Sequence, residues 1–139
     1  MRMVPLVLSL ALVVAACMSG ASIVNFVDLP SLIVVAGLTT TGLFAAHRKP
    51  FSLIWNGLRG KAGPEELKQL EHIAQTGNRL SIGSGWVGFI IGATQMLIGV
   101  EDFSVIQPAS AVLILTILYG HTLSVMFWIP LEQYSKSAS

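Results

Sequence analysis

Four long stretches without a charged side chain constrain this chain more than any other feature. They cover residues 4–23, 29–46, 81–100 and 108–129. A helix needs about 20 apolar residues to cross the hydrocarbon core of a bilayer. The stretches therefore predict an all-α integral membrane protein with four transmembrane helices, in which residues 1–139 form a single membrane domain.

The composition is not that of a water-soluble domain, and the four stretches leave no room for a separate one. Only 11% of the residues are charged and 53% are hydrophobic, whereas about a quarter of the residues in soluble domains are charged. The formal net charge of +1 gives no reason to expect a nucleic-acid partner. A lone bundle of this size offers little interior, so we expect the chain to be an oligomer subunit surrounded by membrane lipid.

Basic residues in the loops predict the orientation. Six of them lie in the loop 47–80: Arg48, Lys49, Arg59, Lys61, Lys68 and Arg79. Arg2 and Lys136 flank the two ends, and the other loops carry only acids: Asp28, Glu101 and Asp102. Because cytoplasmic loops are rich in Lys and Arg, we expect both termini and the 47–80 loop in the cytoplasm, in a bacterial inner membrane.

The N-terminus has two interpretations. Arg2, an apolar run and then Val14-Ala15-Ala16-Cys17 are typical of a bacterial lipoprotein signal with its lipidated cysteine. The interpretation we favour is a first transmembrane helix that contains a cysteine. Cys17 is the only cysteine in the sequence, which excludes an intrachain disulfide and a cysteine metal cage.

Punctuating residues divide the connecting segments. Asp28 and Pro30 predict a tight turn into the second stretch. Residues 51–58 are apolar with a tryptophan, which predicts a segment along the membrane interface. Pro64 begins a short amphipathic helix, and we expect Gly77 to end it before the third stretch.

Small residues follow one face of the third stretch. Ser81, Gly85, Gly88, Gly92, Gln95 and Gly99 recur at steps of three and four. Such a stripe lets another helix approach closely in lipid. The fourth stretch carries a similar line of small or polar residues: Ala109, Thr116, Gly120 and Ser124.

Two polar residues of the fourth stretch stand out. Thr116 is near mid-membrane, where a hydroxyl is more often a packing group bonded to its own helix than part of a site. His121 is a titratable side chain deep in a stretch, as is the Cys17 thiol. It is either functional or a neutral imidazole bonded to a neighbouring helix, and it lies about 140° around the helix from Thr116.

The sequence lacks the residues that several functional classes of protein require. No Asp, Glu, Lys or Arg lies within any of the four stretches, whereas a self-sufficient proton-coupled transporter normally needs one. We find no phosphate loop, nucleophile triad or metal-ligand spacing, because His47, His72 and His121 are scattered. We therefore expect no enzyme activity, metal or cofactor.

Five segments together resemble one family of membrane proteins. Residues 85–97 (GWVGFIIGATQML) resemble the third span of MotA-type stator subunits, and 115–120 (LTILYG) the signature of their fourth span. Residues 26–35 (FVDLPSLIVV) resemble the start of the second span, 100–109 the short periplasmic loop, and Pro130 the proline at the cytoplasmic end. On these segments the chain is similar to the MotA/TolQ/ExbB family.

The resemblance implies a function and a set of site residues. It implies a pentameric ring around a single-span partner of the MotB/TolR/ExbD kind, whose aspartate passes protons or sodium ions and drives mechanical work. The ion-path residues it implies are Thr116, Tyr119 and Gly120, and His121 is a possible titrating group. The residues it implies for packing against the partner are Gly85, Gly88, Gly92, Phe89, Pro108 and Pro130.

The chain departs from the family pattern in ways that leave an alternative open. Ile117 replaces the second threonine of the span-four signature, and Phe89 replaces the span-three threonine. The loop 47–80 is too short for the large cytoplasmic domain of MotA proteins. These departures favour, as an alternative, a non-conducting scaffold that keeps the helix packing. An unrelated small transporter is disfavoured by the missing intramembrane charge.

Overall fold

The computed structural model describes residues 8, 11, 12, 14, 15, 26–99 and 101–138, and the regular structure in these residues is helical. Three helices are long and apolar enough to cross a membrane: Leu29–Ala46, Pro64–Ile98 and Ile106–Ala138. This arrangement is that of a multi-pass membrane protein. The predicted first span, 4–23, lies largely outside the described residues, as does Cys17.

Helix α2 (Leu29–Ala46) coincides with the second predicted span. It begins where the side chain of Asp28 accepts a hydrogen bond of 2.9 Å from the backbone N–H of Ser31, and Pro30 occupies the first turn, where no donor is lost. It ends at His47, whose backbone leaves the helical conformation. Local capping residues therefore set both ends.

Helix α4 (Pro64–Ile98) joins two predicted elements into one helix of 35 residues. The prediction that Gly77 ends a short helix is wrong. A glycine inside a helix costs about 1 kcal/mol relative to alanine, but here it makes room for a neighbour. A Cβ at Gly77 would lie 2.6 Å from the ring of Trp128, so the indole packs directly on the α4 backbone.

The last predicted span is longer than expected at both ends. Helix α5 (Phe103–Leu123) begins five residues before Pro108, because the carboxylate of Asp102 accepts a 2.9 Å hydrogen bond from the N–H of Ser104. A five-residue π-helical segment, η2 (Ser124–Trp128), and helix α6 (Ile129–Ala138) follow without a break. A proline ring collides with the carbonyl four residues before it. For Pro130 that residue is Met126, which lies inside the wider π turn.

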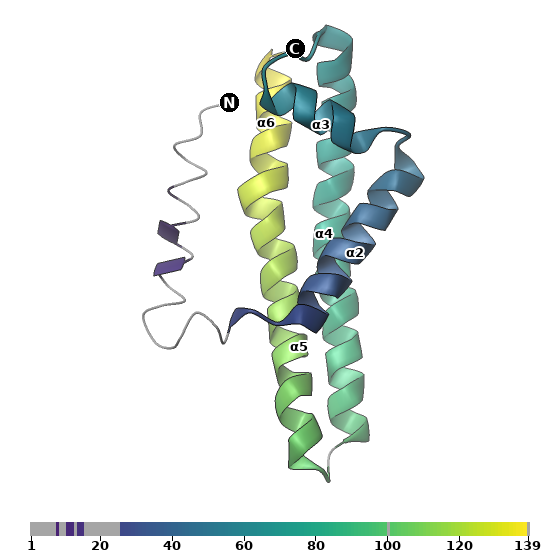
Figure 1. Cartoon of the computed structure of the whole chain (residues 1–139), viewed down its shortest axis with the longest axis vertical. Helices are drawn as coiled ribbons and strands as arrows, with labels where there is room; N and C mark the ends of the chain where they lie inside the picture. Colours follow the sequence, from purple (N-terminus) through teal and green to yellow (C-terminus); the bar gives the residue numbers. More distant parts are fainter. Residues whose placement is uncertain (1–7, 9–10, 13, 16–25, 100, 139) are drawn as a thin grey trace.

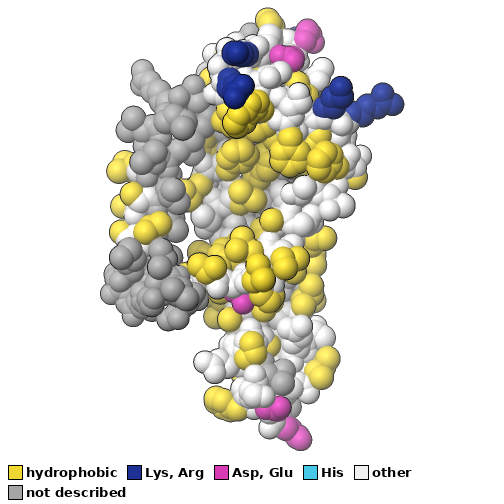
Figure 2. Space-filling model, in the orientation of Figure 1, with side chains coloured by type: hydrophobic (Ala, Val, Ile, Leu, Met, Phe, Trp, Pro, Cys, Tyr) yellow, Lys and Arg dark blue, Asp and Glu magenta, His cyan; other side chains and the backbone are white. Residues whose placement is uncertain are grey.

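The helices form an elongated bundle (Figure 1). Helix α4 stands antiparallel beside α5 and α6, and α2 crosses this pair at an angle. The short helix α3 (Pro50–Leu58) lies across the end at which the chain terminates. On the face drawn in Figure 2, Lys and Arg side chains gather at this end beside acidic ones, and further acidic side chains occupy the opposite tip.

The two halves of the bundle are held together differently. At the α3 end a cluster of large apolar side chains forms a core: Leu43, Ile54, Leu67, Leu70, Ile73, Ala74, Trp128 and Leu131. Along the spans, large apolar residues instead point outward, among them Leu32, Leu38, Ile90 and Ile114. Burying apolar side chains stabilises a structure in water but little in lipid, so small residues must hold the spans together.

Candidate functional site

The small-residue stripe of α4 packs against α5 of the same chain. A Cβ at Gly88 would lie 2.6 Å from the Cβ of Thr116, and one at Gly92 would lie 2.8 Å from the Cα of Leu113. A Cβ at Gly85 would lie 2.9 Å from the carbonyl oxygen of Thr116. Since real Cβ atoms do not approach so closely, a side chain at any of the three positions would force α5 to shift.

Thr116 lies at the centre of this contact. Its side chain is 0% exposed, and its hydroxyl donates a 2.7 Å hydrogen bond to the carbonyl of Val112, one turn earlier in α5. The predicted partner-packing glycines and the predicted ion-path threonine therefore face each other within one chain. In this arrangement neither is open to a partner helix unless α4 and α5 separate.

The other two predicted ion-path residues do different things. Gly120 continues the contact with α4, where a Cβ would lie 3.1 Å from the Cα of Gly85. Tyr119 reaches toward the start of α2 instead: its hydroxyl donates to the carbonyl of Phe26 and accepts a 3.0 Å hydrogen bond from the N–H of Asp28. Tyr119 thus ties α5 to the segment that leads into α2.

The remaining predicted residues are dispersed. Phe89 is half-buried with its ring edge-on to Trp86, at 5.7 Å between centroids. Pro108 is exposed and lines a groove, and Pro130 is half-buried at the start of α6. His121 is exposed, and its Nδ1 lies 2.9 Å from the carbonyl of Ile117 in its own helix. The structure does not bring His121 to the α4–α5 contact.

Sequence reasoning missed a set of polar contacts between helices. The hydroxyls of Thr39 in α2 and Ser84 in α4 lie 3.2 Å apart in a buried position, and Ser84 also donates to the carbonyl of Ser81 at 2.9 Å. The hydroxyl of Ser124 donates to the side-chain carbonyl of Asn78. Ser and Thr inside apolar helices were the available signal, because such side chains often bond across helices in lipid.

A groove near the start of α2 is lined partly by polar side chains. It has a volume of about 770 Å³ between α2, α4 and α5, and its lining includes Asp28, Gln95, Ser104 and Pro108. The Asp28 carboxylate already accepts from the backbone of Ser31. In the described part of the chain, no group of three or more His, Cys, Asp or Glu side chains is placed to hold a metal ion.

No family model and no curated protein matches the chain.

Proposed function

We propose that the chain is a ring-forming subunit of the MotA/TolQ/ExbB kind in a bacterial inner membrane. In this proposal, residues 4–23 form a further span and both termini are cytoplasmic. A homopentamer surrounds a single-span partner that carries an aspartate, and proton or sodium flow past that aspartate drives mechanical work. The chain supplies the ring and the partner supplies the titrating carboxyl group.

One observation carries the proposal: the segments that resemble the third and fourth spans of the family fold against each other. Gly85 and Gly88 meet Thr116, and Gly85 also meets Gly120, at a single antiparallel contact (Figure 1). These residues are about 30 positions apart along the chain, so the two segments form one structural unit. Within the described spans, residues 29–46, 81–98 and 106–129 contain no Asp, Glu, Lys or Arg, which is consistent with a carboxyl group supplied by a partner.

Thr116 is the residue to test for ion flow. A hydroxyl beside a partner's carboxyl group would lower the cost of holding that group in a low-dielectric site, which is otherwise several kcal/mol. We expect Thr116→Val to abolish ion-dependent function and Thr116→Ser to retain much of it. Ile117→Thr, which restores the family's second threonine, should be tolerated.

The measurement is the cytoplasmic pH of cells that express the chain with its single-span partner. A proton gradient is applied across their inner membrane. Thr122→Val is the matched control, because Thr122 is on the same helix but lines a different groove, between α2 and α5. The amount of each variant in the membrane and the mass of its detergent-purified oligomer are measured as checks on expression and assembly. Normal conduction by Thr116→Val would make Thr116 a packing residue only.

The burial of Thr116 favours a second candidate, a non-conducting membrane scaffold. Its hydroxyl is fully buried and bonded to its own helix, so α4 and α5 must rearrange before it can face an ion path. A scaffold would assemble into the same oligomer, as measured by mass in detergent, but pass neither protons nor sodium. If the unmodified complex assembles but passes neither ion, the scaffold proposal replaces the motor proposal.

A further inference from the structure

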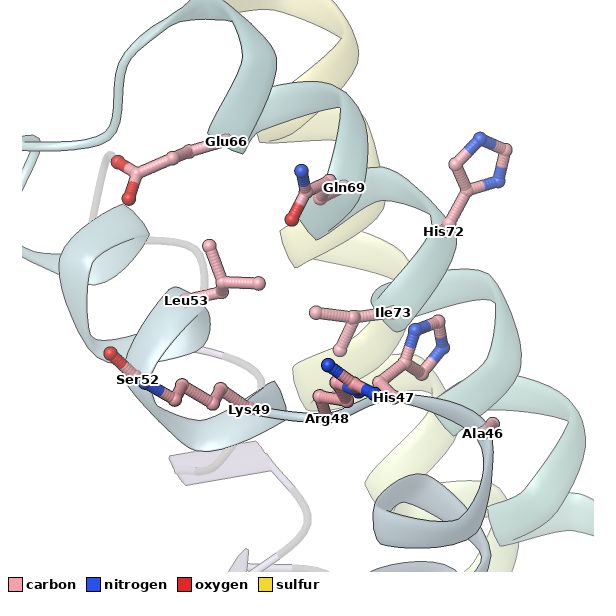
Figure 3. Close-up of a pocket in the computed structure, with 10 residues that line it drawn as sticks. All are labelled: Ala46, His47, Arg48, Lys49, Ser52, Leu53, Glu66, Gln69, His72 and Ile73. Carbon is pink, nitrogen blue, oxygen red and sulfur yellow. The ribbon is translucent and has the colours of Figure 1, made fainter.

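A cavity of about 670 Å³ opens where α2 ends, between α3 and α4. Figure 3 shows Leu53 of α3 and Ile73 of α4 facing each other across it, and the ring of His72 pointing away. The three consecutive residues that follow α2 also line it: His47, Arg48 and Lys49. Ser52 and Gln69 add a hydroxyl and an amide to the lining. The cavity therefore has an apolar floor and a polar rim.

The two strong bases of this cavity are available to bind an anion. Arg48 and Lys49 are exposed, and neither forms an ion pair with an acid among the described residues. The one acid in the lining is Glu66, whose carboxylate accepts a hydrogen bond from the N–H of Gly63 at 3.2 Å. The fixed charges of the lining thus favour a negatively charged ligand.

The position of the cavity identifies the source of that ligand. The 18 residues of α2 span about 27 Å, close to the roughly 30 Å hydrocarbon core of a bilayer. Residues directly after α2 consequently lie at the level of the lipid headgroups. Basic pockets beside membrane helices at that level attract anionic headgroups.

Exposed aromatic side chains on α2 and α3, close in sequence to the residues that line the cavity, support a lipid ligand. The rings of Phe44 and Phe51 lie 5.2 Å apart between centroids, and both are exposed, as is Trp55. The guanidinium of Arg59 lies 4.4 Å from the centroid of the Trp55 ring. Aromatic side chains at the membrane interface contact the region where headgroups meet acyl chains, so a lipid bound here could touch rings and bases together.

We propose that this cavity binds the headgroup of an anionic phospholipid such as phosphatidylglycerol. The guanidinium of Arg48 matches two phosphate oxygens, and the ammonium of Lys49 adds a point charge. The hydroxyl of Ser52 and the amide of Gln69 supply further donors to the phosphate or the glycerol. The bound lipid fixes the corner between α2 and α3. The proposal does not depend on ion conduction by the chain.

The test measures lipid binding to the purified full-length chain in detergent. Phosphatidylglycerol and phosphatidylcholine are titrated separately, and bound lipid is counted by native mass spectrometry. We expect preferential binding of phosphatidylglycerol, and an affinity roughly thirty-fold lower in R48Q/K49Q. The control K61Q/K68Q removes the same two charges outside the cavity and should bind as the unmodified protein does.

A second variant keeps the test sharp if R48Q/K49Q is poorly folded. Gln69→Glu places a negative charge in the lining at an exposed position and should also weaken binding. Equal binding of the two lipids by the unmodified protein would overturn the proposal, as would equal affinities of R48Q/K49Q and K61Q/K68Q. Displacement of the lipid by millimolar inorganic phosphate would show a site for the free anion instead.

Discussion

The α4–α5 contact makes a quantitative prediction for Gly88→Ala. The added Cβ would lie closest to the methyl group of Thr116 and 2.6 Å from its Cβ, whereas ordinary contact begins at 3.4 Å, so the two helices must separate locally by at least about 0.8 Å or distort. Overpacking of this kind typically costs about 1–3 kcal/mol. We expect Gly88→Ala to lower the free energy of unfolding by that amount relative to a matched control.

The control is Gly83→Ala on the same helix, where a new Cβ meets nothing within 4 Å. Both variants gain about 1 kcal/mol of helix propensity, so the difference between them isolates the packing penalty. Unfolding is followed by circular dichroism during an SDS titration of the purified protein. Equal stabilities of the two variants would refute the close contact between α4 and α5.

Adding Thr116→Ser to Gly88→Ala tests which atoms collide. The change removes the threonine methyl group, the part of Thr116 nearest the new Cβ, and keeps the hydroxyl. Residues in direct contact show coupling energies of about 0.5–3 kcal/mol, so we expect partial recovery of stability.

Gly88→Leu would open this intrachain contact as well, so loss of the oligomer in that variant would not by itself identify a partner helix on the stripe.

Three further predictions concern the other helices. Tyr119→Phe removes two hydrogen bonds at the start of α2 and should lower the free energy of unfolding by about 1–3 kcal/mol. It should also speed the labelling of a cysteine introduced at Val27, and an unchanged labelling rate would contradict this. Ser84→Ala breaks the contact with Thr39 and should cost only about 0.6 kcal/mol, with no further loss when Thr39→Val is added. A cysteine at the exposed Lys61 should react only with membrane-permeant reagents in intact cells, and reaction with an impermeant reagent would reverse the proposed orientation.

Local sequence signals located much of the fold. The uncharged run 29–46 and its flanking Asp28 gave the bounds of α2, because capping and hydrophobic length act within a few residues. The same reasoning failed at Gly77, which continues α4. Glycine is only a weak helix breaker, and the indole of Trp128, distant in sequence, occupies the space that its missing side chain leaves.

For the candidate site, the sequence predicted which face of the third span is lined by small residues, but not which helix packs against that face. The spacing of Gly85, Gly88 and Gly92 predicted a close helix contact, because helical periodicity places these residues on one side. Periodicity carries no information about which helix fills that side. Only the packed structure assigns it to α5 and Thr116 of the same chain.

The sequence by itself determined that this chain is helical and apolar enough to cross a membrane several times, because apolar runs of about 20 residues match the length of a helix that satisfies its own backbone hydrogen bonds across the hydrocarbon core. It also determined where the basic residues fall along the chain. The tertiary structure decided which of these residues meet. It buried Thr116 against Gly88 and brought Arg48 and Lys49 beside Gln69 of α4 around one cavity, because such contacts depend on how separate helices pack.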